Sequence, residues 1–148
     1  MRFYGFGNYY LSSLQQGLQA AHSVAELFIK YKTDSIQKAV LYDWANEHKT
    51  MVLLNGGNSA DLLSLKSHFE YLHTLGMDLP FSYFKEDEQS LNNAVTYVGI
   101  VVPNKHYEIA SEARKLRENE KHLFLESFNL HPWELALIDV LNNYKLAN

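Results

Sequence analysis

The segment 94–102, AVTYVGIVV, limits the fold of this chain more than any other feature. Successive side chains of a strand point to opposite faces of a sheet, and this segment is apolar on both. A strand of this kind must be covered from both sides. The sequence therefore predicts a sheet in which residues 94–102 are buried, with helices packed on each face.

Three other segments have the composition of strands. Aromatic residues and glycine alternate in residues 2–10, residues 49–54 form a short apolar run, and residues 79–84 carry a proline near their start. The acidic connection 85–93, KEDEQSLNN, is short, so it favours an antiparallel pairing of the strands on either side.

Helical periodicity is found between and after these strands, in residues 13–31, 35–48, 59–75, 106–122 and 132–144. Ser12 and Gln15 form a capping box at the start of the first helix, and Pro132 suits the first turn of the last. The expected inward positions of the first two helices are Leu14, Leu18, Ala21, Ala25 and Phe28 or Ile29, then Ile36, Val40 and Trp44. Residues 55–59, NGGNS, are expected to form a turn.

The predicted order is β-α-α-β-α-β-β-α-α, in which helices between strands favour parallel crossovers. We therefore predict the α/β class, with three layers: a mixed four-stranded sheet and helices on both faces. A length of 148 residues suits a single domain over 1–148, and the chain contains no repeat or linker-like tract.

Composition excludes several classes of function. The chain has no cysteine, which rules out disulfides and thiolate chemistry and fits a reducing, cytoplasmic location. No apolar run is long enough to span a membrane, and the aromatic N-terminus does not resemble a signal peptide. The net charge of −4 argues against a protein that mainly grips nucleic acid, although a local basic patch is compatible with it.

The helix at 13–31 carries a polar row formed by Gln15, Gln19, His22 and Glu26 at helical spacing. A solvated face explains this row, and so does one edge of a binding or catalytic cleft. In the second case His22 can shuttle a proton while Glu26, one turn away, orients it.

Glu86, Asp87 and Glu88 lie together between the last two predicted strands. Neighbouring carboxylates can raise the pKa of one member and create a general base, or they can hold a divalent cation. A solvated hairpin tip explains the cluster equally well. No histidine spacing supports a metal site and the glycines of residues 55–59 lack P-loop spacing, so we expect neither metal nor cofactor.

In order and spacing, several of these segments resemble the type II peptidyl-tRNA hydrolases. They are LQQGLQAAHS, KTMVLLNGG, LLSLKSHFEYLHTLG, FKEDE and NNAVTYVGIVVP. That family has Gly-Lys-x-Ala-Ala-Gln-x-x-His-Ala on its first helix, then an acidic turn and a threonine-bearing apolar strand. The resemblance covers residues 1–103 and implies the three-layer fold of the family, with residues 104–148 as a helical addition.

The resemblance implies a set of site residues. Gln19 and His22 match the Gln-x-x-His spacing of the family, and Ser23 takes the place of the alanine that follows. Glu86 or Asp87 corresponds to the acidic residue. The remaining matches are Thr96, at the threonine of the last strand, and Gln15, at the position of the family's lysine.

Two functions follow from this resemblance. The first is hydrolysis of the ester bond of peptidyl-tRNA, with Glu86 or Asp87 activating water near His22, Thr96 assisting, and Gln15, Gln19 and Ser23 binding substrate. The second is a non-enzymatic module that binds a small ligand or protein in the same cleft.

The apolar face of the last helices can cover the sheet of this chain or of a second copy, which allows a homodimer.

Overall fold

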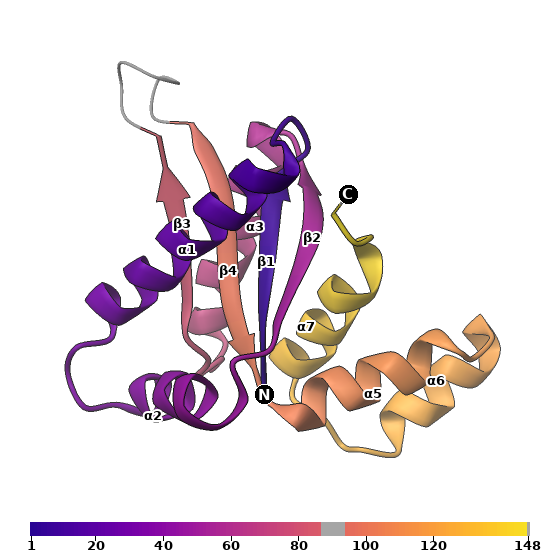
Figure 1. The fold of residues 1–148 in the computed structure, drawn as a ribbon. Coiled ribbons are helices and arrows are strands. Elements are labelled where there is room, and N and C mark those ends of the chain that lie inside the picture. Colours follow the sequence, from indigo (N-terminus) through magenta and orange to yellow (C-terminus); the bar gives the residue numbers. More distant parts are fainter. Residues whose placement is uncertain (87–93, 148) are drawn as a thin grey trace.

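A computed structural model of the chain describes residues 1–86 and 94–147. Its sheet has the order β2-β1-β4-β3 (Figure 1) and is formed by β1 (Arg2–Asn8), β2 (Met51–Gly57), β3 (Phe81–Lys85) and β4 (Val95–Val102). β1 pairs parallel with β2, whereas β4 runs antiparallel to both β1 and β3. The predicted mixed four-stranded sheet is confirmed, and β4 is buried along its whole length.

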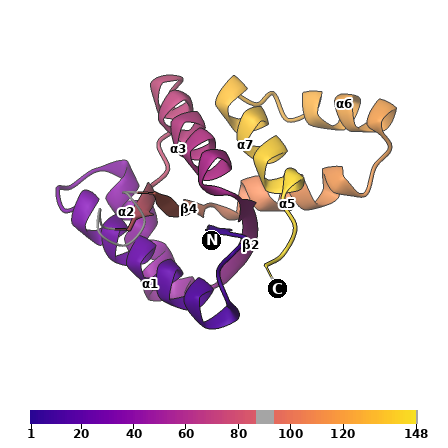
Figure 2. The ribbon, with the colours of Figure 1, turned by 90° about the horizontal axis from the view of Figure 1, so that it is seen from above.

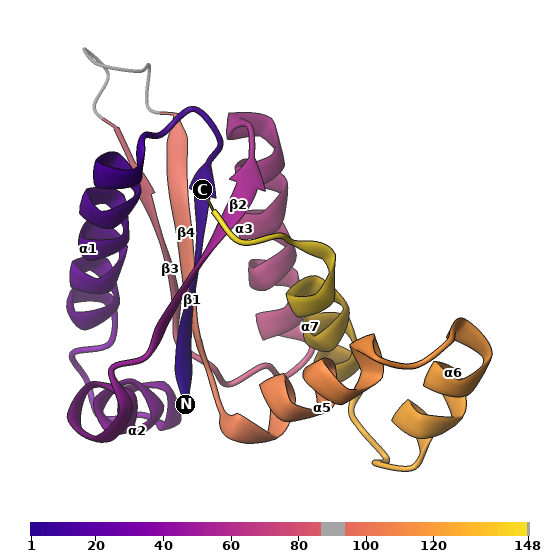
Figure 3. The same ribbon diagram turned by 45° about the vertical axis from the view of Figure 1, so that its right-hand side comes forward.

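Helices cover both faces of this sheet, which confirms the general three-layer α/β architecture (Figures 2 and 3). One face carries α1 (Ser13–Lys30) and α2 (Ile36–Asp43), with the π-helical turn η1 (Trp44–His48). On the other face lie α3 (Ser59–Thr74) and α7 (Pro132–Asn143), flanked by α5 (Asn104–Arg114) and α6 (Glu118–Glu126). No helix in the described residues is long and apolar enough to cross a membrane.

Local capping explains where α1, α3 and α7 begin or end. Ser12 accepts a hydrogen bond from the Gln15 amide, and the Gln15 side chain accepts one from the Ser12 amide, so the predicted capping box is present. Gly76 follows α3 with a positive φ of 105°, a conformation that glycine adopts without steric cost. Pro132 occupies the first turn of α7, as predicted.

Two predicted boundaries were wrong. Residues 106–122 form parts of two helices, because α5 ends at Arg114 and Arg117 begins the next helix with its amide bonded to the Glu120 carboxylate. Residues 55–57, expected in a turn, continue β2: Asn55 pairs with Gly7 and donates its amide to the carbonyl of Lys145. The C-terminal segment supplies this bond, so local sequence could not reveal it.

The larger core lies on the α3 side of the sheet. The periodicity of α3 predicted its inward residues correctly, since Leu62, Leu65, Phe69 and Leu72 are all buried. Phe69 is at the centre, with its ring 6.1 Å from that of Phe6 and 5.8 Å from that of Phe81. Helix α7 adds the buried residues Trp133, Leu137, Ile138, Val140 and Leu141.

The predicted inward face of α1 was wrong. Its buried residues are Gln16, Ala20, Ser23 and Leu27, whereas Leu14 is 74% exposed and Leu18 is 54% exposed. In α2, Ile36 is likewise 62% exposed. The reason is the surface beneath α1: a Cβ on Gly99 of β4 would lie 2.5 Å from the Ser23 hydroxyl oxygen. The helix approaches the sheet too closely there for a larger inward side chain.

The C-terminal segment covers the outer edge of β2. The Asn55 amide donates to the Lys145 carbonyl at 2.9 Å, and the Ala147 amide donates to the Leu53 carbonyl at 2.9 Å. Leu54 and Leu146 form an antiparallel bridge between these bonds. The tail therefore satisfies backbone groups that an open edge strand would leave exposed.

Candidate functional site

A bulge near the start of β4 gives Thr96 its position. Phe84 pairs with Tyr97 and Lys85 with Val95, so Thr96 is an extra residue on β4. A bulge of this kind redirects a side chain relative to its neighbours. The Thr96 hydroxyl donates a 3.0 Å hydrogen bond to the side-chain oxygen of Gln19 on α1.

Gln19 connects Thr96 to a carboxylate. Its side-chain amide donates a 2.6 Å hydrogen bond to Glu86 Oε1, just beyond the end of β3. Thr96, Gln19 and Glu86 thus form one hydrogen-bonded series from three separate parts of the chain. The glutamine oxygen accepts from the hydroxyl while its nitrogen donates to the carboxylate, which fixes the orientation of the amide.

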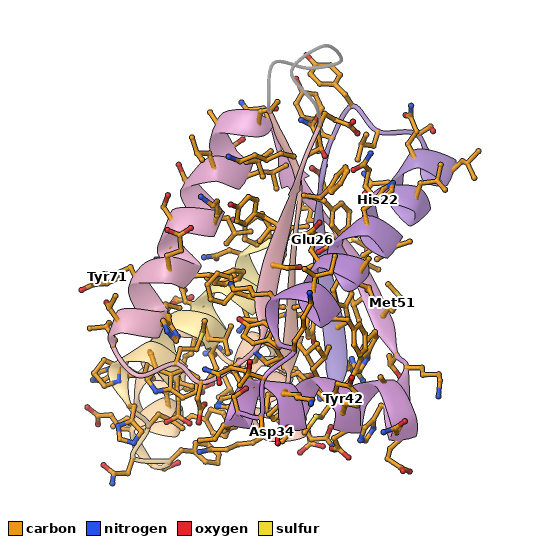
Figure 4. The ribbon with its side chains drawn as sticks, turned by 90° about the vertical axis from the view of Figure 1, so that its left-hand side faces the viewer. His22, Glu26, Asp34, Tyr42, Met51 and Tyr71 are labelled. Carbon is orange, nitrogen blue, oxygen red and sulfur yellow. The ribbon has the colours of Figure 1, made fainter. Side chains whose placement is uncertain are left out.

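His22 lies next to this series and is exposed to solvent. Its ring stacks on that of Phe84, with 4.4 Å between the centroids and 9° between the planes. Figure 4 shows His22 and Glu26 on the side of α1 that borders β3. The hydrogen bonds and ion pairs of the described residues do not join the two, so the structure offers no support for Glu26 as the group that orients His22.

The remaining candidate residues have other surroundings. Gln15 is exposed and takes part in the capping box of α1. Ser23 is buried between α1 and the sheet, where its hydroxyl lies 3.0 Å from that of Ser82 and its carbonyl accepts from Ser82 at 2.7 Å. Asp87 lies outside the described residues. The structure therefore brings together Gln19, Glu86 and Thr96, with His22 beside them.

A surface cavity of about 410 Å³ continues from the His22–Phe84 pair along β3. Phe84 belongs to its wall, as do Lys30 and Lys85. Lys30 stands over the Phe81 ring at 3.8 Å and donates to the Phe81 carbonyl at 3.0 Å. Burial lowers the pKa of Lys30, although the charge of Glu70 acts in the opposite direction.

Sequence reasoning missed Lys30 and Lys85, because they come from α1 and β3 and share no motif. Lys85 and Lys66 both stand over the Tyr83 ring, at 5.6 Å and 4.4 Å from its centroid. Cationic and aromatic groups thus alternate along the edge of the sheet next to the site. Such a combination is suited to a nucleic-acid backbone and its bases.

The described residues contain no group of three histidine or carboxylate side chains placed to hold a metal ion. Neither family models nor curated proteins contain a significant match to this sequence.

Proposed function

We propose that the protein hydrolyses the ester bond that joins a peptide to the 3′ end of tRNA, in the manner of the type II peptidyl-tRNA hydrolases. The single observation that carries the proposal is the series Thr96–Gln19–Glu86. These residues match positions that the resemblance implies for the site, and they meet through hydrogen bonds although 77 positions separate Gln19 from Thr96.

Glu86 is the general base of this proposal. Its carboxylate removes a proton from water while the water oxygen attacks the ester carbonyl carbon, and the tetrahedral intermediate then breaks its bond to the ribose oxygen. The proton passes to that oxygen, so the products are a free peptide acid and a tRNA hydroxyl. Gln19 holds the carboxylate in place, and Thr96 holds Gln19.

His22 and the lysines of the β3 edge bind the tRNA in this proposal. The exposed face of His22, supported from below by Phe84, can stack against the base of the terminal adenosine. Lys85 and Lys30, which line the adjoining cavity, are placed to contact phosphates. Glu26 also lines this cavity, so two cations face one carboxylate there.

A second candidate function is binding without hydrolysis, and Gln15 favours it. The resemblance places a lysine of the family at this position, but the neutral amide here is engaged in the cap of α1. It carries no charge to stabilise a developing oxyanion. A cleft that retains Gln19, Glu86 and Thr96 but lacks this cation can bind an RNA end or a small ligand without cleaving it.

The decisive experiment measures peptide release from a purified peptidyl-tRNA. The wild type should release peptide, and Glu86→Gln should slow release by roughly a hundredfold or more, the usual effect of losing a general base. Glu118→Gln, which neutralises an exposed carboxylate on α6 away from the site, is the matched control and should retain full activity. Equal rates for the wild type and a Glu86→Gln, Asp87→Asn double variant would overturn the proposed mechanism.

A Gln15→Lys variant separates the two candidate functions. If the wild type binds peptidyl-tRNA without releasing peptide, binding without hydrolysis is supported. Peptide release by Gln15→Lys would then show that the missing charge is the reason. The substitution removes a capping interaction, so we expect it to cost about 1 kcal/mol of stability, which thermal unfolding would report.

A further inference from the structure

A second cavity, of about 860 Å³, lies on the opposite side of the sheet from the candidate hydrolytic site. Strands β1 and β2 form its floor, α5 and α7 form its sides, and the C-terminal tail forms one wall. The tail is held there by its hydrogen bonds to Asn55 and Leu53. This volume is in the range of sites that enclose a small organic ligand.

Two arginines face this cavity without a carboxylate partner. Neither Arg2 nor Arg114 forms an ion pair among the described residues. Arg114 donates through Nε to the side chain of Asn142 at 3.1 Å, and the Arg2 guanidinium stands 4.0 Å from the centre of the Tyr107 ring. Both contacts position the guanidinium groups without neutralising their charge.

Tyr4 lines the same cavity as both arginines. Tyr4 is largely buried in the floor of the cavity. Burial raises the pKa of Tyr4, while the positive charges of Arg2 and Arg114 act to lower it. Two cations and a neutral hydroxyl donor thus line one cavity, a combination suited to the oxygens of an anion.

One carboxylate of the cavity wall has a cationic neighbour of its own. Glu112 forms an ion pair with Lys115, with 2.9 Å between Nζ and Oε1. Glu108 is the other carboxylate of the wall. Lys145 adds a third cation to the lining, so positive charge prevails.

The rest of the cavity is apolar. Leu54 and Leu141 are buried beneath it, and Val52, Tyr107 and Leu146 complete its walls. An inorganic anion would leave these side chains in contact with water. A ligand with an apolar part removes them from water and gains free energy in proportion to the area covered.

We propose that this cavity binds an amphipathic anion, that is, a carboxylate or phosphate group joined to an apolar chain. The anionic group lies between Arg2, Arg114 and the Tyr4 hydroxyl. The apolar chain extends over Leu54 and Leu141 beneath the C-terminal tail. This binding site is independent of the proposed hydrolytic function, because the sheet separates the two.

The test uses octanoate and octyl phosphate as probes, 1-octanol as the neutral analogue, and isothermal titration calorimetry on the full chain. We expect saturable one-to-one binding of at least one anion and much weaker binding of octanol. Arg114→Gln and Arg2→Gln should each weaken binding about tenfold, the usual worth of a charged hydrogen bond. Arg117→Gln, which removes an arginine outside the cavity, should leave the affinity unchanged.

Two further variants keep the proposal testable if an arginine substitution unfolds the chain. Glu108→Gln removes a negative charge from the cavity wall and should raise the affinity for the anions. Arg114→Lys keeps the positive charge and should retain part of the wild-type affinity. A preference for octanoate or for octyl phosphate identifies the anionic group. Binding of neither anion by folded wild type, equal binding of octanol, or full affinity in Arg114→Gln would each overturn the proposal.

Discussion

The two faces of the sheet are built from different kinds of residue. On the α3 and α7 side, aromatic and branched side chains such as Phe6, Phe69 and Phe81 fill a large continuous core. On the α1 side, Gly5, Gly7 and Gly99 leave room for Tyr97 and for polar residues of the helix. The first face supplies most of the buried apolar contact, and the second brings a polar helix close to the sheet.

The close approach on the α1 side carries an energetic cost. The Tyr97 hydroxyl and the Gln16 side-chain oxygen are buried there with no hydrogen-bond partner in the described part of the chain. Such atoms lose the hydrogen bonds that water would make. The same approach lets Gln19 reach both Glu86 and Thr96. Stability is thus concentrated on one face and the candidate chemistry on the other.

The largest expected effect is loss of the Phe69 ring. Phe69→Ala should lower the free energy of unfolding by about 3–5 kcal/mol, because it leaves a cavity between α3 and the sheet. Urea denaturation measures this change. Leu14→Ala on the outer side of α1 is the control and should change stability by less than about 0.5 kcal/mol. Similar losses for both variants would contradict the division between the faces.

The junction of α5 and α7 should be sensitive to acid. Burial alone would raise the pKa of Glu134, but hydrogen bonds from His106, the His131 amide and Lys105 lower it from 4.5 to about 2. The ionised Glu134 carboxylate therefore stabilises the folded state. This contribution is complete above about pH 4.5 and is lost as the pH falls toward about 2, on the order of 3 kcal/mol in total. Urea denaturation at several pH values measures the loss.

A Glu134→Gln variant should be less stable at neutral pH and should flatten this acid dependence. Glu118→Gln, at an exposed ion pair on α6, is the matched control and should keep the wild-type profile. An unchanged acid profile in Glu134→Gln would show that other groups cause the dependence.

On the α1 side, adding one methyl group at the buried Gly99 should lower stability more than truncating the exposed side chain of Leu14. Gly99→Ala places a Cβ 2.5 Å from Ser23 Oγ and 2.6 Å from the Phe3 ring, so we expect a loss of about 1–3 kcal/mol. Gly17→Ala is the matched control, since nothing lies within 4 Å of its Cβ, and it should stabilise α1 by up to about 1 kcal/mol. Thermal unfolding of the two variants compares them directly, and a loss of stability in both would argue against the close approach.

The smallest expected effect concerns Tyr97. Tyr97→Phe removes a buried hydroxyl that has no partner, so stability should stay the same or rise by about 1 kcal/mol. Denaturant titration measures it. A clear loss of stability would mean that the hydroxyl is satisfied, for example by a bound water molecule.

Predictions from the sequence were correct where a regular apolar pattern packs against one continuous core. The inward residues of α3 and the buried strand β4 were identified correctly, because each is apolar on every side that faces the core. The same reasoning failed for α1, whose leucines face outward and whose Gln16 and Ser23 face inward. Hydrophobicity could not reveal that glycines on two strands would form the surface beneath this helix.

The role of the candidate site residues stays a prediction, but the structure shows which of them are in contact. The resemblance drew attention to Gln19, Glu86 and Thr96, yet the hydrogen bonds that join them depend on the bulge in β4. The cavity between Arg2 and Arg114 had no sequence signal at all, since its residues come from β1, β2, α5, α7 and the C-terminal tail.

The sequence by itself determined the α/β class, the helix caps and the buried central strand, because backbone propensity and side-chain periodicity are local properties. Only the tertiary structure decided which side of α1 faces the sheet, where β2 ends, and which polar groups meet. Those outcomes depend on contacts between residues far apart in the chain, whose free energies outweigh the local preferences of a single helix or strand.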